Sequence, residues 1–206
     1  MKRWYYIVLG LILIGGIVYI YMHRQELGLV GPSLETSNAE PSPLPAHIVW
    51  ATVDRSPEGF KLEMPQDTRE IQIPAYNELG GTDQVEMIYS YPDSATSFSV
   101  AWADNPPVER AVEENPQQTL DFAQEGALAR TQTVLVNQSS SQNPGYLLRE
   151  FSGRNEGGGV FNARLILAGR RLYMLMAAFP AASARRDSDV THFFDSFQLV
   201  PSVRND

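Results

Sequence analysis

Apolar and polar residues follow three different patterns along the chain. Residues 4–22 form one uninterrupted apolar run without a charged residue. Residues 23–46 are polar and rich in proline and serine. From residue 47 to about residue 200, short apolar segments alternate with turn-forming residues, which is typical of a folded domain. The pattern therefore predicts a membrane anchor at 1–22, a Pro/Ser-rich tether at 23–46, a folded domain at 47–200 and a short tail at 201–206.

The first run predicts a single transmembrane helix, with the lipid bilayer as its partner. About 19 residues at ~1.5 Å rise span roughly 28 Å, which matches the hydrocarbon core of a membrane. Lys2 and Arg3 precede the run, which favours a cytoplasmic N-terminus and a domain exported to a periplasm or lumen. The alternative, a cleaved signal peptide, has a shorter apolar core of ~7–15 residues and a small-residue cleavage site. Aromatic residues mark both ends of the run, as expected for membrane–water interfaces; they are Trp4, Tyr5, Tyr6, Tyr19 and Tyr21.

Within residues 47–200 the pattern predicts an α+β fold, an antiparallel β-sheet with helices packed on it. Asn115 and Pro116 open a helix as N-cap and first helical residue. A second helix over 187–197 has a buried stripe that includes Phe193 and Phe197. The segment 172–179 is apolar on both faces, so we expect it to be covered on both sides. The other predicted strands are 48–53, 60–64, 70–73, 84–91, 95–103, 133–137, 146–151 and 160–167.

Composition removes several classes of function. The chain has no cysteine, which excludes disulfides and thiolate chemistry. Its net charge of −8 argues against a nucleic-acid binder, which needs a basic surface. The three histidines are isolated in sequence, and no motif for a nucleotide, a metal protease or a serine hydrolase is present. We therefore predict no catalytic residue, no cofactor and no metal site.

Charge is distributed unevenly along the domain. Residues 47–128 contain 15 acidic and 4 basic residues, whereas residues 129–206 contain 6 acidic and 9 basic ones. Arginine suits ion pairs at interfaces, and a polarised domain suits oriented docking. The alternative is that the two halves interleave in the sheet and the asymmetry cancels in space. The candidate partner-contact residues are Arg149, Arg154, Arg164, Arg170, Arg171, Arg185 and Arg186.

The order of several short motifs resembles the PsbP superfamily, the extrinsic lumenal proteins of photosystem II and their bacterial relatives. The matching segments are GFKLEMP at 59–65, NP at 115–116, GAL at 126–128, PGY at 144–146, REF at 149–151, GRRLY at 169–173 and FFDSF at 193–197. The resemblance implies an α/β/α sandwich and a noncatalytic role in stabilising photosynthetic membrane complexes. The chain departs from it in the predicted anchor, which leaves the partner less certain than the fold.

These observations together predict a noncatalytic accessory subunit of an integral membrane protein complex, most specifically a photosynthetic reaction-centre assembly. Two other classes stay open at this point. A membrane-anchored small-molecule-binding or sensory module would have a deep apolar pocket with a few polar groups. A cryptic hydrolase would have clustered carboxylates with perturbed pKa values.

Overall fold

The computed structural model describes residues 47–76, 82–93, 96–104, 115–180 and 184–201. The predicted anchor at 1–22, the tether at 23–46 and the tail after residue 201 lie outside these ranges, together with the five aromatic residues assigned to the membrane interface. None of the described helices has the length and apolarity to cross a membrane.

Two antiparallel sheets form the framework of the domain. The larger has the strand order β3-β4-β5-β9-β8-β7-β6, and the smaller has the order β1-β2-β10. The strands of the larger sheet are β3 (Arg69–Tyr76), β4 (Thr82–Ser90), β5 (Ser97–Asp104), β6 (Val134–Asn143), β7 (Tyr146–Arg154), β8 (Val160–Ala168) and β9 (Arg171–Phe179). The remaining elements are β1 (Trp50–Arg55), the 3-10 helix η1 (Ser56–Glu58), β2 (Phe60–Pro65), α2 (Pro116–Thr131), α3 (Ala184–Asp195) and β10 (Gln198–Leu199).

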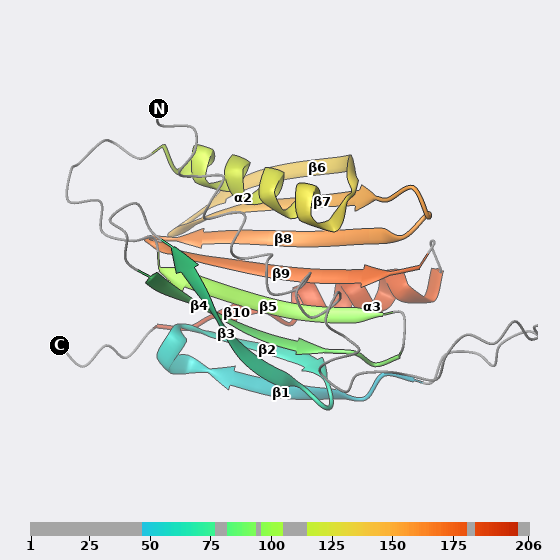
Figure 1. Cartoon of the computed structure of the whole chain (residues 1–206). Coiled ribbons are helices and arrows are strands. Elements are labelled where there is room, and N and C mark those ends of the chain that lie inside the picture. Colours follow the sequence, from blue (N-terminus) through green and yellow to red (C-terminus); the bar gives the residue numbers. More distant parts are fainter. Residues whose placement is uncertain (1–46, 77–81, 94–95, 105–114, 181–183, 202–206) are drawn as a thin grey trace, which may run out of the picture.

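The elements stack in three layers (Figure 1). Helix α2 lies against β7 and β8 on one face of the larger sheet. Helix α3 and the smaller sheet contribute to a second apolar core on the opposite face. The predicted α+β class is therefore confirmed, with one correction. The sequence predicts a single sheet, whereas β1, β2 and β10 form a sheet of their own.

Strand β9 separates the two apolar cores. Leu172, Met174 and Met176 belong to the core on the α2 side, whereas Tyr173 and Leu175 belong to the other core. Successive side chains of a strand point to opposite faces, so an apolar strand in the centre of the sheet serves both cores. The prediction that this strand is covered on both sides is confirmed.

Helix α2 begins where the sequence predicts. The side chain of Asn115 accepts a hydrogen bond from the backbone N–H of Gln117 at 3.1 Å, which satisfies one of the free N–H groups of the first turn. Leu120, Ala123 and Ala127 are buried along one side of the helix. This apolar stripe fixes α2 on the larger sheet.

Several element boundaries differ from the predictions. β6 continues to Asn143, beyond the predicted end at 137, because its second half lacks apolar residues and gives no alternating pattern. α3 ends at Asp195, so Phe197 lies beyond the helix that was predicted to contain it. Phe197 still packs in the second core, where it stacks on Phe60 at 5.6 Å between ring centroids. The short strand β10 was not predicted.

Gly153 provides a test of the packing between α2 and β7. A Cβ atom at this position would lie 2.6 Å from Oγ1 of Thr133 and 2.9 Å from a methyl carbon of Leu128. We expect Gly153→Ala to lower the free energy of unfolding by about 1–3 kcal/mol, as overpacking of a tight site does. Urea denaturation measures the effect, with Gly157→Ala as control, because the nearest neighbour of its Cβ would be at an ordinary 3.5 Å. Equal stabilities of the two variants would contradict the packing described.

Candidate functional site

Arg149 lies beneath α2 and is only 5% exposed. Its guanidinium donates hydrogen bonds to Oδ1 of Asp121 at 2.5 Å and to the side-chain oxygens of Gln117 and Gln124 at 3.3 Å each. Its Nε donates to Oγ of Ser140 at 3.3 Å. The side chain therefore connects β7, β6 and α2 inside the domain. The predicted partner contact of Arg149 is corrected for this reason, since the folded domain leaves little of it accessible.

Arg164 joins β8 to the end of α3. It donates to Oε1 of Glu150 at 2.7 Å, to the backbone oxygen of Phe194 at 2.5 Å and to Oδ1 of Asp195 at 3.0 Å. The guanidinium also lies 5.1 Å from the centroid of the Phe194 ring. A cation at the C-terminus of a helix interacts favourably with the helix dipole and the last carbonyl groups. We therefore infer that the main role of Arg164 is to hold α3 in place.

Three other candidate partner-contact residues lie at opposite ends of the larger sheet; they are Arg154, Arg170 and Arg171. Arg170 is exposed in the β8–β9 turn, and Arg171 beside it donates to the backbone oxygen of Glu58 at 2.6 Å. Arg154 is exposed at the end of β7, where its register partner is Val160 at the start of β8. A nine-residue strand separates the two ends, which corresponds to roughly 30 Å. The predicted arginines therefore do not gather into one patch. The side chains of Arg185 and Arg186 are outside the described part of the structure.

The charge asymmetry of the sequence is partly preserved in space. The strand order places β3, β4 and β5 on one side of the larger sheet and β6 to β9 on the other, so the two halves do not interleave there. Helix α2 crosses this division, because it belongs to the acidic half and covers β7 and β8. Its Asp121 pairs with Arg149. The asymmetry is therefore reduced where the two halves meet.

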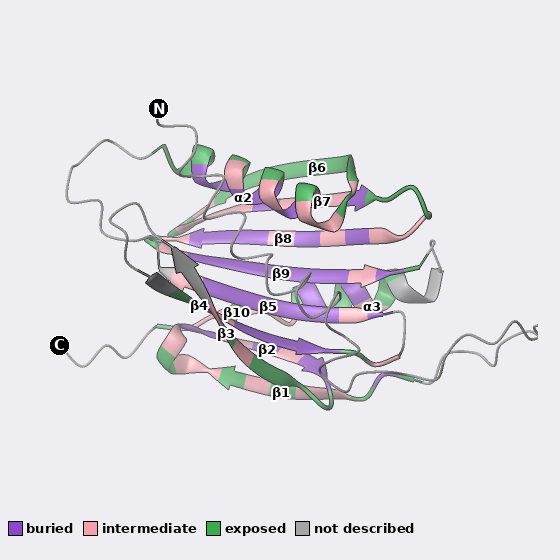
Figure 2. Cartoon of the chain, in the orientation of Figure 1, coloured by how far each residue is buried: buried purple, intermediate pink, exposed green. Residues whose placement is uncertain are grey.

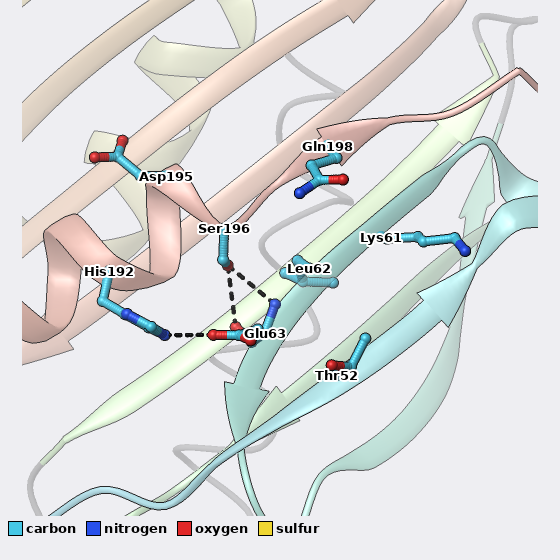
Figure 3. Close-up of a pocket in the computed structure, with 8 residues that line it drawn as sticks. All are labelled: Thr52, Lys61, Leu62, Glu63, His192, Asp195, Ser196 and Gln198. Atoms are coloured by element: carbon cyan, nitrogen blue, oxygen red, sulfur yellow. Dashed lines mark hydrogen bonds and ion pairs between the residues drawn. The ribbon is translucent and has the colours of Figure 1, made fainter.

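A shallow depression lies on the smaller sheet beside the end of α3 (Figure 3). Its volume is about 560 Å³. Nε2 of His192 is 2.6 Å from Oε2 of Glu63, and both side chains are nearly half exposed. The ring of His192 also lies 4.5 Å from that of Trp50. The lining residues are Thr52, Lys61, Leu62, Glu63, His192, Asp195, Ser196 and Gln198.

The hydrogen bonds of Ser196 in this depression are to the backbone. Oγ of Ser196 accepts from the backbone N–H of Glu63 at 3.0 Å and donates to the backbone oxygen of Phe193 at 2.8 Å. Nucleophilic catalysis requires a serine that is bonded to its base, whereas His192 contacts Glu63 here. The group therefore joins α3 to β2 and gives no support to a hydrolase. The described residues contain no group of three or more potential ligands that could hold a metal ion.

His192 is isolated in the sequence, and no local motif points to its contact with Glu63. The two residues are separated by 129 positions. No local spacing can reveal such a pair, because it depends on how α3 returns to the smaller sheet.

Glu86 on β4 provides a test of the local electrostatics. Burial raises the pKa of its carboxyl, and the negative charges of Glu58 and Glu70 raise it further, against the opposing effect of Arg55 and Arg171. A raised folded-state pKa means that the ionised carboxylate destabilises the fold above that pKa, and that the penalty disappears as the pH falls below the unfolded value of 4.5.

We therefore expect Glu86→Gln to raise the melting temperature at neutral pH and to have no effect at a pH well below 4.5. Thermal melts across this range measure it, with Glu156→Gln in an exposed loop as control. A lower melting temperature at neutral pH would show that the carboxylate is stabilising.

Two antiparallel sheets with helices on either side define the domain as PsbP-like in fold. Among solved structures, the solution structure of cyanobacterial PsbP (CyanoP) from Synechocystis sp. PCC 6803 is similar, with a TM-score of 0.50 and 10% sequence identity, over 80% of this chain and 98% of that chain. At this identity the likeness establishes the fold alone. The resemblance of the sequence motifs to the PsbP superfamily is confirmed for the fold alone.

Two further solved structures match with lower TM-scores. The Ran-binding protein Mog1p of Saccharomyces cerevisiae has a TM-score of 0.43 at 11% identity, over 76% of this chain and 98% of that chain. A putative regulator of unknown function from Pseudomonas aeruginosa has a TM-score of 0.37 at 15% identity, over the same shares. Neither carries an argument about function. No protein-family model and no curated protein matches the sequence.

Proposed function

We propose that this protein is a noncatalytic accessory subunit of an integral membrane protein complex, held by a helix at residues 1–22, with its domain in a periplasm or lumen. The PsbP-like fold of the domain is the observation that carries the proposal. The long apolar run at residues 4–22 supplies the means of anchoring. The most specific partner that we propose is a photosynthetic reaction-centre assembly.

The described surface agrees better with docking than with ligand binding. Small-molecule sites are usually clefts or cavities that bury most of the ligand, whereas the depression near His192 is shallow and the side chains of His192 and Glu63 are nearly half exposed. A tether makes a second contact intramolecular, so that two weak contacts give firm association. We therefore propose that the helix packs within the membrane complex and that the domain adds a polar contact outside it.

We propose that the domain docks by the end at which the chain enters it. Trp50 begins β1, and its ring contacts that of Phe98 at 5.5 Å. Phe98 pairs with Ala177 near the end of β9. At the same end, Phe179 of β9 pairs with Val160 of β8, and Val160 pairs with Arg154 of β7. Arg154 thus lies at the end where the chain enters the domain, and Arg170 at the far end.

We predict that Arg154→Glu weakens retention of the domain on its partner and that Arg170→Glu, the same change at the other end, has less effect. Both side chains are exposed, so each change should alter stability by no more than ~0.5 kcal/mol. The measurement is the salt concentration at which each variant dissociates from its partner complex after the membranes are solubilised with detergent. Exposed charge contacts are screened by salt. A larger effect of Arg170→Glu would place the contact at the far end instead.

The anchor is tested separately. We expect the full chain to sediment with membranes, to resist a high-salt wash and to keep the mass of residues 1–206, whereas a chain that begins at residue 46 should be soluble. A mature mass that lacks the first ~22–30 residues would show a cleaved signal peptide and would overturn the anchoring.

A further inference from the structure

β6 is an edge strand whose outer side is open. It stands at the end of the seven-stranded order, and β7 is the one strand that pairs with it in the described part of the chain. Every residue of β6 except Asn143 is exposed, and Figure 2 shows the strand as an exposed border of the sheet. An open edge is a template for the addition of another strand.

The other long edges of the described sheets carry residues that discourage strand addition, but β6 does not. β3 contains Arg69, Glu70 and Pro74, and β1 contains Asp54 and Arg55. β6 has the sequence VLVNQSSSQN, with neither charge nor proline. Charges and proline are the usual protection of an edge. β6 lacks both, so its side chains do not oppose the addition of another strand.

The sequence of β6 is also self-complementary. Residues 137–143 read NQSSSQN, which is the same in both directions about Ser140. The irregularity in the ladder lies before this run, between Leu135 and Asn137, so the run itself has a regular register with β7. If two copies pair antiparallel about Ser140, asparagine faces asparagine, glutamine faces glutamine and serine faces serine. Amides and hydroxyls both donate and accept hydrogen bonds, so each such pair is compatible.

We propose that β6 pairs with β6 of a second copy of this chain, about a two-fold axis at Ser140, and joins the two larger sheets into one. The ladder of about seven residues would be roughly 24 Å long. Pro144 follows directly, and it ends the ladder because it has no N–H to donate. Val136, which is 54% exposed, would then lie against Pro144 of the second copy.

A second copy suits this edge better than a charged partner segment, because β6 offers no charge to complement. A ladder of this length buries less than the ~1,200 Å² of a standard interface. The pairing is therefore weak in dilute solution and depends on a high local concentration, which a shared membrane would supply.

The absence of cysteine makes disulfide trapping a clean test. The full chain carrying Ser140→Cys is oxidised in freshly lysed cells. Directly opposite residues of antiparallel strands have Cα atoms about 4.5–5.5 Å apart, within the range of a disulfide. We expect a covalent dimer from Ser140→Cys and none from Thr191→Cys, an exposed position on α3.

The register is tested by co-expressing differently tagged chains with Ser139→Cys and Ser141→Cys. Residue 139 of one copy faces residue 141 of the other, so the mixed dimer should exceed the dimers of either variant alone.

In chains that also carry Ser140→Cys, lysine at both 139 and 141 should reduce trapping on the order of tenfold through like-charge repulsion. Glutamate at both positions should do the same, and a mixture of the two charged chains should restore trapping.

Melting temperatures near that of the parent chain would show that the charged variants are folded. Trapping of Ser140→Cys at the level of Thr191→Cys would overturn the proposal. So would an adduct with a different protein, or trapping that is indifferent to charge. The proposal takes the high local concentration from the anchoring in the proposed function, but it does not need the larger complex, because a dimer can form whether or not that complex binds it.

Discussion

Phe193→Ala is expected to lower the free energy of unfolding by about 3–5 kcal/mol, the usual range for deleting a buried phenylalanine ring. Phe193 is fully buried. Its ring contacts that of Phe98 on the larger sheet at 5.3 Å and that of Phe194 at 5.6 Å between centroids. The residue therefore attaches α3 to the face of β5, and the cavity left by alanine could not be filled without moving the helix.

Chemical denaturation of a chain that begins at residue 46 measures this effect, with Val49→Ala as control. Val49 is 57% exposed, so its truncation should change stability by no more than ~0.5 kcal/mol. A loss below about 1 kcal/mol for Phe193→Ala would mean that α3 does not belong to the folding unit. A noncooperative transition of the parent domain would show instead that part of the core comes from a partner.

Asp121→Ala is expected to destabilise the domain more than Arg149→Met, although both break the same ion pair. The loss of Asp121 leaves the buried guanidinium of Arg149 with neutral partners, at an expected cost of about 2–3 kcal/mol. This is less than the ~3–5 kcal/mol of a fully buried pair, because the Asp121 side chain is 54% exposed. Arg149→Met replaces the charge by an apolar chain of similar length, which buried sites often tolerate.

The double variant Asp121→Ala with Arg149→Met should be close in stability to Arg149→Met alone, since no buried charge then remains. Arg154→Met is the matched control on the same strand, and we expect it to change stability by no more than ~0.5 kcal/mol because Arg154 is exposed. If Arg149→Met were the more damaging single change, the guanidinium would act mainly through its hydrogen bonds to Gln117, Gln124 and Ser140.

The parts of the fold that the sequence predicts are those encoded by local patterns. The cap at Asn115 and the two apolar faces of 172–179 depend on neighbouring residues, and the structure confirms both. β6 shows where this reasoning fails. Residues 138–143 have no apolar alternation, and only pairing with β7 makes them a strand. The separate sheet of β1, β2 and β10 depends on the return of the chain after α3.

The candidate site is less predictable because ion pairing is a long-range property. The sequence shows that arginines are concentrated after residue 128, but not that Arg149 meets Asp121 across 28 positions or that Arg164 meets Asp195 across 31. Such pairs are defined by the placement of α2 and α3 on the sheet. Arg154 and Arg170 are exposed at the ends of strands, and their contact with a partner stays a prediction.

Gradient sedimentation of gently solubilised membranes tests the proposed function most directly. The account predicts that the full chain migrates with a large assembly of integral membrane proteins, identifiable by mass spectrometry of the same fraction. It also predicts that Arg154→Glu lowers the salt concentration at which the chain leaves that fraction. Migration as a free chain, or as a pair of chains without other proteins, would contradict the accessory role, and the second result would leave the β6 pairing intact.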